Sequence, residues 1–167
     1  FIEPPILDRA SAEYERFVAA IRSLGAEVTF LPRDETTTLD SIYVRDASIA
    51  SPRGMILCRM GKPQREQEPA AQRAAFAAMT PSVPVIGEIV APGSLEGGDL
   101  VWLNDRTVIV GHGYRTNGAG IEQLRELLGD SVDEFVVVPL PHWKGESDVM
   151  HLMSLISPLD SDLAVVH

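Results

Sequence analysis

Apolar residues recur at the spacing of one helix face in three parts of the chain. Each part is followed closely by a glycine or a proline, residues that commonly end helices. Ser11 is of a type that caps helix N-termini, so the first helix is expected to begin there. The spacing predicts three helices, over residues 11–24, 72–79 and 120–128.

Short apolar runs, bounded by turn-forming residues, lie between and after these helices. Runs of this length are typical of β-strands, and Asn104, Asp105 and Arg106 between two of them indicate a hairpin. The runs cover residues 27–31, 42–49, 54–58, 85–90, 100–103, 107–110, 134–138 and 163–166. The order helix–strand–strand–strand recurs with a period near 50 residues. This order predicts an α/β or α+β layered domain.

Composition and charge narrow the class of protein. With 167 residues, 45% hydrophobic and 23% charged, the chain is long enough for one domain with its own core. No apolar run reaches the roughly 18 residues that span a bilayer, so we expect no membrane segment. The net charge of −10 disfavours nucleic acids and anionic membranes as partners. It would attract small cations, or it serves solubility alone. A single cysteine, Cys58, excludes an internal disulfide and indicates a cytoplasmic location.

Four segments place charged residues among apolar ones, where ionised groups are rare unless they are paired or functional. The segments span residues 39–49, 94–102, 111–120 and 148–156. In the first, Asp40 and Asp46 would share one face of an ideal strand, about 20 Å apart, unless a turn brings them closer. They would bracket an elongated ligand, or Asp46 would simply pair with Arg45 or cap a turn. Both interpretations stay open at this point.

The other three segments offer one or two polar candidates each. Glu96 and Asp99 flank two glycines, which allow a close backbone approach or form a plain turn. Arg115 lies in a glycine-rich stretch without phosphate-loop spacing, where it holds a carboxylate or is a surface residue. His151 lies in an apolar stretch, as a core histidine or as a general acid–base. No metal-binding spacing accompanies it, so we expect no zinc.

Taken together and in this order, five short stretches resemble the guanidine-modifying enzymes: dimethylargininases, arginine deiminases and amidinotransferases. The stretches are LDSIYVRDAS (39–48), CRMGKPQRE (58–66), LEGGD (95–99), GYRTN (113–117) and HLMS (151–154). These enzymes share the five-bladed α/β propeller called the pentein fold. The resemblance implies an α/β (α+β) pentein propeller with about three of its five blades present. Residues 1–167 would then form a single incomplete pentein-fold domain without the C-terminal blades.

Dimethylargininases are the branch that this chain resembles most. Residues 59–65 and 114–117 match their motifs, and Met153 stands where the deiminases and amidinotransferases carry an aspartate. Arg45 departs from the pattern, because dimethylargininases often have glutamate there, and one contact to the guanidinium is thereby lost. The departure at Arg45 bears on whether the substrate is methylated. The expectation of a guanidino substrate does not depend on it.

The resemblance also implies a role for six residues of the chain. Asp40 and Asp46 would hold the substrate's amino and guanidinium ends, and Arg65 and Arg115 would clamp its α-carboxylate. Two residues would be catalytic: Glu96 would complete the acidic guanidinium site, and His151 would protonate the leaving amine and activate water.

The implied activity is hydrolysis at the guanidinium carbon, with dimethylarginine giving citrulline and dimethylamine through a covalent cysteine intermediate. The family's nucleophilic cysteine lies near the C-terminus, in a part of the fold outside this chain, and Cys58 is expected to be a core thiol. Because the chain starts at Phe1 and ends directly after an apolar run, we expect it to be part of a longer polypeptide and inactive alone.

Several alternatives stay open. Within the superfamily they are an arginine deiminase, an arginine hydrolase or an amidinotransferase, and in another class a non-catalytic binding module. The implied ligand is a small cationic guanidino compound, with no metal and no cofactor. Protein partners would be a second copy of the chain, as a homodimer, or a complementary C-terminal fragment.

Overall fold

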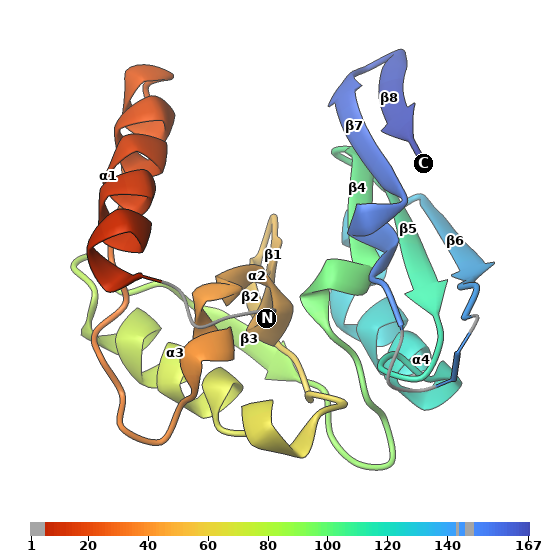
Figure 1. Cartoon of the computed structure of the whole chain (residues 1–167). Helices are drawn as coiled ribbons and strands as arrows, with labels where there is room; N and C mark the ends of the chain where they lie inside the picture. Colours follow the sequence, from red (N-terminus) through yellow and green to blue (C-terminus); the bar gives the residue numbers. More distant parts are fainter. Residues whose placement is uncertain (1–5, 143, 146–148) are drawn as a thin grey trace. The chain divides into compact units, whose positions relative to one another are not determined.

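The computed structural model describes residues 6–142, 144–145 and 149–167 (Figure 1). The chain divides into two compact units, Phe1–Pro32 and Arg33–His167. All six residues with a predicted role belong to the second unit. Asp148, the first residue of the fourth charged segment, lies outside the described residues. Within the described residues, no helix is both long enough and apolar enough to cross a membrane.

The first unit consists of helix α1 (Leu7–Ser23) and the segment that follows it. The helix starts earlier than predicted, so Ser11 lies inside it and is not its N-cap. The apolar run 27–31 forms no strand. Its Phe30 ring instead lies against Tyr14 of the helix, with the ring centroids 6.4 Å apart. The run therefore contacts helix α1 through the aromatic side chain of Phe30.

The second unit repeats one topology along the chain. In each repeat an antiparallel hairpin is followed by a helix and by a strand parallel to the hairpin's second strand. The first repeat comprises β1 (Ser48–Ser51), β2 (Gly54–Leu57), α3 (Glu68–Ala78) and β3 (Val85–Glu88). The second comprises β4 (Leu100–Asn104), β5 (Thr107–His112), α4 (Gly118–Leu128) and β6 (Glu134–Pro139). A third antiparallel hairpin comes after β6, formed by β7 (Ile156–Asp160) and β8 (Leu163–Val166).

This repetition agrees with the periodicity of the sequence. The first strands of the three hairpins begin at Ser48, Leu100 and Ile156, which fits the predicted period near 50 residues. The predicted hairpin around Asp105 is confirmed by the antiparallel pairing of β4 with β5. The mixed α/β class is confirmed as well. Strand β7 was not predicted.

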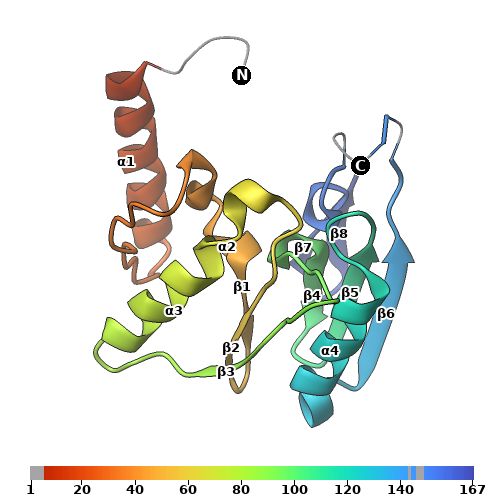
Figure 2. The same cartoon turned by 90° about the horizontal axis from the view of Figure 1, so that it is seen from below.

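Short helical turns precede each hairpin, and most of the residues with a predicted role lie in or next to these turns. Figure 2 shows the strands β4, β5 and β6 of the second repeat side by side, with α4 beside them. They are η1 (Leu39–Ile42) and α2 (Val44–Ala47) before β1, η3 (Gly97–Asp99) before β4, and η6 (Leu152–Ser154) before β7. Two further turns, η2 (Pro63–Arg65) and η4 (Gly129–Ser131), lie next to α3 and α4.

The strand predicted over residues 42–49 is wrong for most of its length. The backbone N–H groups of Ser41, Tyr43 and Asp46 donate to carbonyls three residues earlier, which is the pattern of helical turns. The strand begins only at Ser48. Asp40 and Asp46 therefore lie on successive turns and not at opposite ends of one strand.

One apolar cluster connects the first two sheets with α4. Its fully buried members include Ile56, Leu95, Leu100, Val108, Val110 and Leu124. Cys58 belongs to the same cluster and is 4% exposed, as expected for a core thiol. Close packing of this kind gives the turns ahead of β1 and β4 a rigid base.

Candidate active site

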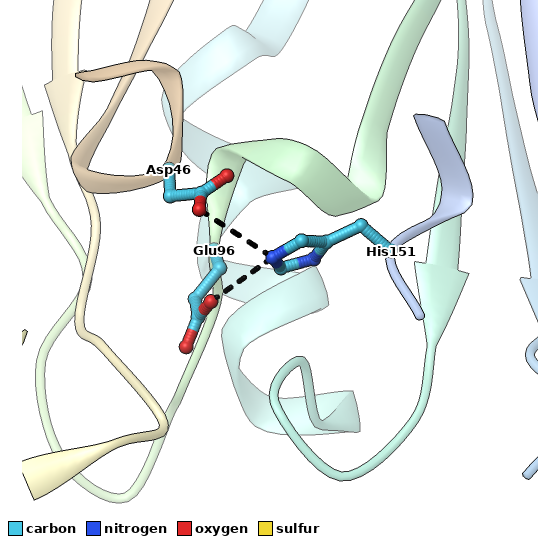
Figure 3. A group of neighbouring side chains, drawn as sticks. All are labelled: Asp46, Glu96 and His151. Atoms are coloured by element: carbon cyan, nitrogen blue, oxygen red, sulfur yellow. Dashed lines mark ion pairs between the residues drawn. The ribbon is translucent and has the colours of Figure 1, made fainter. Parts of the chain in front are cut away.

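Three short turns, one ahead of each hairpin, supply polar side chains that meet in the second unit. Asp46 lies in α2, Glu96 immediately precedes η3, and His151 immediately precedes η6. Figure 3 shows both carboxylates directed at the imidazole ring. Groups that are far apart in the sequence thus form one cluster.

The His151 ring has a polar partner at each nitrogen. Nε2 is 3.3 Å from Oε2 of Glu96 and 3.6 Å from Oδ2 of Asp46. Nδ1 is 3.0 Å from Oδ1 of Asp99, a residue for which the sequence predicted no role of its own. The ring is 12% exposed, and three carboxylates surround it. This environment favours acid–base chemistry over the role of an ordinary core histidine.

Gly98 allows this histidine to lie directly on the backbone of η3. A Cβ atom at this position would be 2.6 Å from Cγ of His151 and 2.7 Å from Oδ1 of Asp46. Any side chain would therefore displace the imidazole ring. Gly98 is needed for this close approach, and a Cβ atom at Gly97 would clash with the backbone carbonyl of Arg45, so the glycine pair is more than a plain turn.

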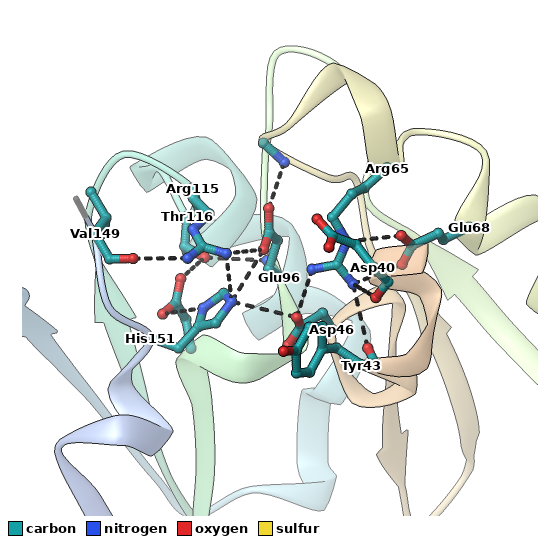
Figure 4. A network of polar contacts seen from close by, with 12 residues as sticks. Asp40, Tyr43, Asp46, Arg65, Glu68, Glu96, Arg115, Thr116, Val149 and His151 are labelled. Carbon is teal, nitrogen blue, oxygen red and sulfur yellow. Dashed lines mark hydrogen bonds and ion pairs between the residues drawn. The ribbon is translucent and has the colours of Figure 1, made fainter. Parts of the chain in front are cut away.

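Arg65 is buried and its guanidinium is bound within the protein (Figure 4). Nη1 donates to Oδ2 of Asp46 at 2.7 Å, and Nε and Nη2 donate to the two oxygens of Glu68, each at 2.8 Å. Nη2 also donates to the backbone carbonyls of Asp40 and Tyr43. All three nitrogens thus have protein acceptors, and the residue is 2% exposed.

These contacts assign Arg65 to holding Asp46 in place and leave it poorly suited to the predicted clamp on a substrate carboxylate. Glu68, its second partner, was missed at the sequence level. The available signal was the i, i+3 spacing of an arginine and a glutamate at the start of a helix. Asp40 contributes its backbone carbonyl to this network, and among the described residues its carboxylate makes no ion pair.

Arg115 places a guanidinium group inside the acidic cluster. Its Nη1 is 3.0 Å from Oε2 of Glu96 and 2.8 Å from Nε2 of His151, and its Nη2 donates to the carbonyl of Val149. The predicted surface alternative for this arginine is therefore wrong, because the side chain is only 16% exposed. A planar cation with carboxylate and imidazole neighbours is the arrangement expected for a bound guanidino ligand.

The side chain of Arg45 makes its hydrogen bond outside the cluster around His151. Its Nη2 donates to the carbonyl of Leu100, so among the described residues Arg45 is not the partner of Asp46. The sequence-based alternative of an Arg45–Asp46 pair is wrong.

The surrounding charges shift the pKa values of Asp46, Glu96 and His151. Burial alone would raise the pKa of Asp46, but hydrogen bonds with His151 and Arg65 outweigh it and lower the pKa to about 2. Burial also opposes ionisation of Glu96, yet His151 and Arg115 lower its pKa. Burial alone would lower the pKa of His151, but its bonds to Asp46, Asp99 and Glu96 raise the pKa to about 10.

Protonation of His151 is linked to the position of Arg115. A guanidinium only donates hydrogen bonds, so its contact with Nε2 requires an unprotonated lone pair on that nitrogen. A protonated Nε2 instead donates to Glu96 or Asp46. Proton uptake at His151 and departure of the Arg115 guanidinium therefore favour one another.

The pH dependence of stability depends on these shifts. Between about pH 6.5 and 10 the folded state keeps the His151 proton that the unfolded chain has lost, so the free energy of unfolding should fall as pH rises, by up to about 1.4 kcal/mol per pH unit. Below about pH 4 it should fall again, because the unfolded chain protonates Asp46 first. Urea unfolding across this range measures both slopes. In His151→Gln the alkaline slope should become shallower, and an unchanged slope would contradict this origin.

Other chemistry at this cluster is disfavoured by its composition. Asp46, Glu96 and His151 each offer a ligand atom within 4.8 Å of the others, as a metal site would. The same oxygens of Asp46 and Glu96 that face His151 already accept hydrogen bonds from Arg65 and Arg115, however, so this arrangement suits N–H donors better than a metal ion. Burial, followed by the charge of Glu96, raises the pKa of the Cys58 thiol, which makes it a poor nucleophile.

Comparisons with known proteins agree with this geometry. The sequence model of the arginine deiminase family matches residues 39–167. The dimethylarginine dimethylaminohydrolase (DDAH) of Streptomyces coelicolor is 32% identical over 159 residues, which cover 95% of this chain and 57% of that protein. The chain thus spans little more than half the length of this curated relative.

Solved structures show the same fold. The DDAH of Pseudomonas aeruginosa, a cysteine-to-serine variant complexed with citrulline, superposes with a TM-score of 0.81 at 24% identity, covering 99% of this chain and 61% of that one. An arginine dihydrolase from cyanobacteria gives a TM-score of 0.78 at 20% identity, covering 95% of this chain and 23% of that one. The chain therefore belongs to the arginine deiminase family, as a dimethylargininase-like member of the arginine deiminase and amidinotransferase superfamily.

Proposed function

We propose that this chain provides the guanidinium site and the general acid–base of a hydrolase that acts on an arginine-like substrate. The first candidate reaction is dimethylarginine to citrulline and dimethylamine. The observation that carries the proposal is the Arg115 guanidinium, which lies between Glu96 and His151 as a substrate guanidinium would. The name of the Streptomyces relative supports the same substrate.

In the proposed mechanism a substrate guanidinium replaces that of Arg115. Asp46 and Glu96 bind its N–H groups, and both stay ionised because their pKa values are lowered. A thiolate attacks the guanidinium carbon and forms a C–S bond. The C–N bond to the methylated nitrogen breaks, and dimethylamine leaves with the proton of His151. Water then gives one proton to His151 while its oxygen bonds to the carbon, and the C–S bond breaks. The sulfur leaves as a thiol with the second proton, which yields the neutral ureido group.

The thiolate is proposed to come from outside these residues. Cys58, the single cysteine, is packed in the core, and burial raises its pKa.

We also propose that residues 1–167 form a single incomplete pentein-fold domain with about three of five blades. Two complete repeats and the hairpin of a third support this, as does the limited coverage of the relatives. The chain alone should then lack turnover.

Two residues remain candidates for the amino acid end of the substrate. Once displaced from Glu96, Arg115 can turn its guanidinium toward an α-carboxylate. Asp40, whose carboxylate makes no ion pair within the described part of the chain, can pair with the α-amino group. Arg65 is proposed to act through Asp46 and not on substrate.

A substrate screen tests the proposal. The full-length protein and the 167-residue chain are incubated with arginine, monomethylarginine, asymmetric dimethylarginine and agmatine, and ureido product, ammonia and dimethylamine are measured. We expect ureido product and dimethylamine from the full-length protein alone, with Cys58→Ser unchanged as the control. Ammonia from arginine alone would indicate a deiminase or dihydrolase, which the cyanobacterial neighbour favours. Binding without product would indicate a binding module and contradict the proposal.

Arg115→Ala should separate substrates by their carboxylate. KM for arginine-type substrates should rise about tenfold or more, because a charge-assisted contact to the α-carboxylate is lost. Agmatine has no α-carboxylate, and removal of the competing Arg115 guanidinium should leave its KM unchanged or lower it. Steady-state kinetics with both substrates measure the difference. An equal rise of KM for both would contradict the clamp.

A further inference from the structure

We propose that Thr116 is a positioning residue that acts through Asp99 to hold the His151 ring with Nε2 facing Glu96 and Asp46. The inference builds on the proposed function, because it concerns the same acid–base. The resemblance to guanidine-modifying enzymes gives Thr116 no role, although it gives one to the adjacent Arg115.

The Thr116 hydroxyl is fully buried and its hydrogen bonds have one consistent direction. The backbone N–H of Glu96 donates to Oγ1 at 3.2 Å, and Oγ1 lies 2.6 Å from Oδ2 of Asp99. A backbone N–H can only donate, so the hydroxyl oxygen accepts there and its proton goes to Asp99. The bond is short, as expected for a hydroxyl that donates to a carboxylate.

Asp99 transmits this contact to the histidine. Its other oxygen, Oδ1, accepts from the backbone N–H of Leu152 at 3.1 Å and lies 3.0 Å from Nδ1 of His151. An ionised carboxylate only accepts, so Nδ1 carries the proton of this bond and Nε2 is left to exchange protons with a substrate. Asp99 is 1% exposed, and Thr116 prevents its carboxylate from rotating away from the ring.

The loop that carries Thr116 acts on both nitrogens of the imidazole ring, one directly and one through Asp99. Arg115 reaches Nε2 directly, and its neighbour Thr116 acts on Nδ1 through Asp99. Two backbone hydrogen bonds hold the loop: the Thr116 carbonyl accepts from Gly113, and the N–H of Asn117 donates to Ser94. Figure 4 shows Thr116, Arg115 and His151 grouped together at this side of the network. Residues 115 and 116, which follow β5, therefore help to position both nitrogens of His151, which precedes the third hairpin.

Kinetics of the full-length protein test the proposal. Thr116→Val keeps the shape but removes the hydroxyl, and we expect kcat to fall about tenfold or more while KM changes less than about threefold. Thr116→Ser should restore kcat, because the hydroxyl returns. Thr107→Val, in strand β5, is the matched control and should not change kcat. Equal activity of the Val and wild-type proteins would overturn the proposal.

A second readout does not depend on turnover. In ¹H–¹⁵N spectra of histidine-labelled protein, the Nδ1 proton of His151, assigned by its loss in His151→Gln, should be downfield and slow to exchange in the wild type and in Thr116→Ser. It should be lost or shifted in Thr116→Val. If the wild type hydrolyses no guanidino substrate, the proposed function fails, and this resonance alone still decides the role of Thr116.

Asp99→Asn covers the case in which Thr116→Val does not fold. The amide keeps the size of the carboxylate but accepts a weaker hydrogen bond, so the resonance should move upfield and kcat should fall about tenfold or more. If neither changes, Asp99 does not orient the ring and the proposal is wrong.

Discussion

Replacement of His151 by glutamine should lower kcat for ureido product by about a hundredfold to ten-thousandfold in the full-length protein. General acid–base catalysis contributes this much, and glutamine can form hydrogen bonds but cannot carry the proton to the leaving amine. KM should change little, because Asp46 and Glu96 remain to bind the guanidinium. Steady-state kinetics and citrulline formation measure the effect.

His112→Gln is the matched control for this variant. His112 is exposed and lies at the end of β5, so its replacement should not alter kcat. Circular dichroism of both variants checks that the fold is kept. A His151→Gln protein that turns over at the wild-type rate would remove the imidazole from the mechanism, and the proposed reaction would need another proton donor.

Arg65→Met should destabilise the fold by about 3–5 kcal/mol, the cost of removing one partner of a buried ion pair. Asp46 and Glu68 would be left as buried carboxylates without their shared guanidinium. Arg73→Met is the control. Arg73 pairs with Glu88 at the surface, where such pairs contribute less than about 1 kcal/mol. Urea unfolding at neutral pH measures the free energy of both variants.

The same variant separates two roles for Arg65. If it positions Asp46, its loss should reduce stability and affect all guanidino substrates alike. A stable Arg65→Met protein with a KM raised only for substrates that carry an α-carboxylate would contradict this role. The sequence-based assignment of a carboxylate clamp would then stand.

Hydrophobic periodicity predicted the bounds of an element well where that element buries a single face. Helix α4 spans Gly118–Leu128, close to the predicted 120–128, because its apolar positions pack into the core. The same rule failed around residues 42–47. Alternating polar and apolar residues there fit a strand, but the backbone carbonyls of Asp40 and Tyr43 are bound by Arg65 from another turn. A local pattern carries no information about such a distant donor.

Residue types pointed to the members of the site but not to all of their roles. Asp46, Glu96 and His151 were singled out as polar groups in apolar surroundings, and the structure brings them together. Arg65 drew attention by its place in a motif, whereas its burial and its pairing with Glu68 depend on tertiary structure. Asp99 was named only as a neighbour of two glycines, because its partner His151 lies far along the chain.

The site is built from three successive turns, each of which precedes a hairpin, and their order along the chain has a consequence for how the protein is made. A ribosome releases the Asp46 turn first, the Glu96 turn next and the His151 turn last. Until the last turn emerges, the site holds the carboxylates of Asp46 and Glu96 and the guanidinium groups of Arg65 and Arg115 but no imidazole. The proton donor is therefore acquired only after the His151 turn has been synthesised, and a product terminated before His151 would hold Asp46 and Glu96 but lack it.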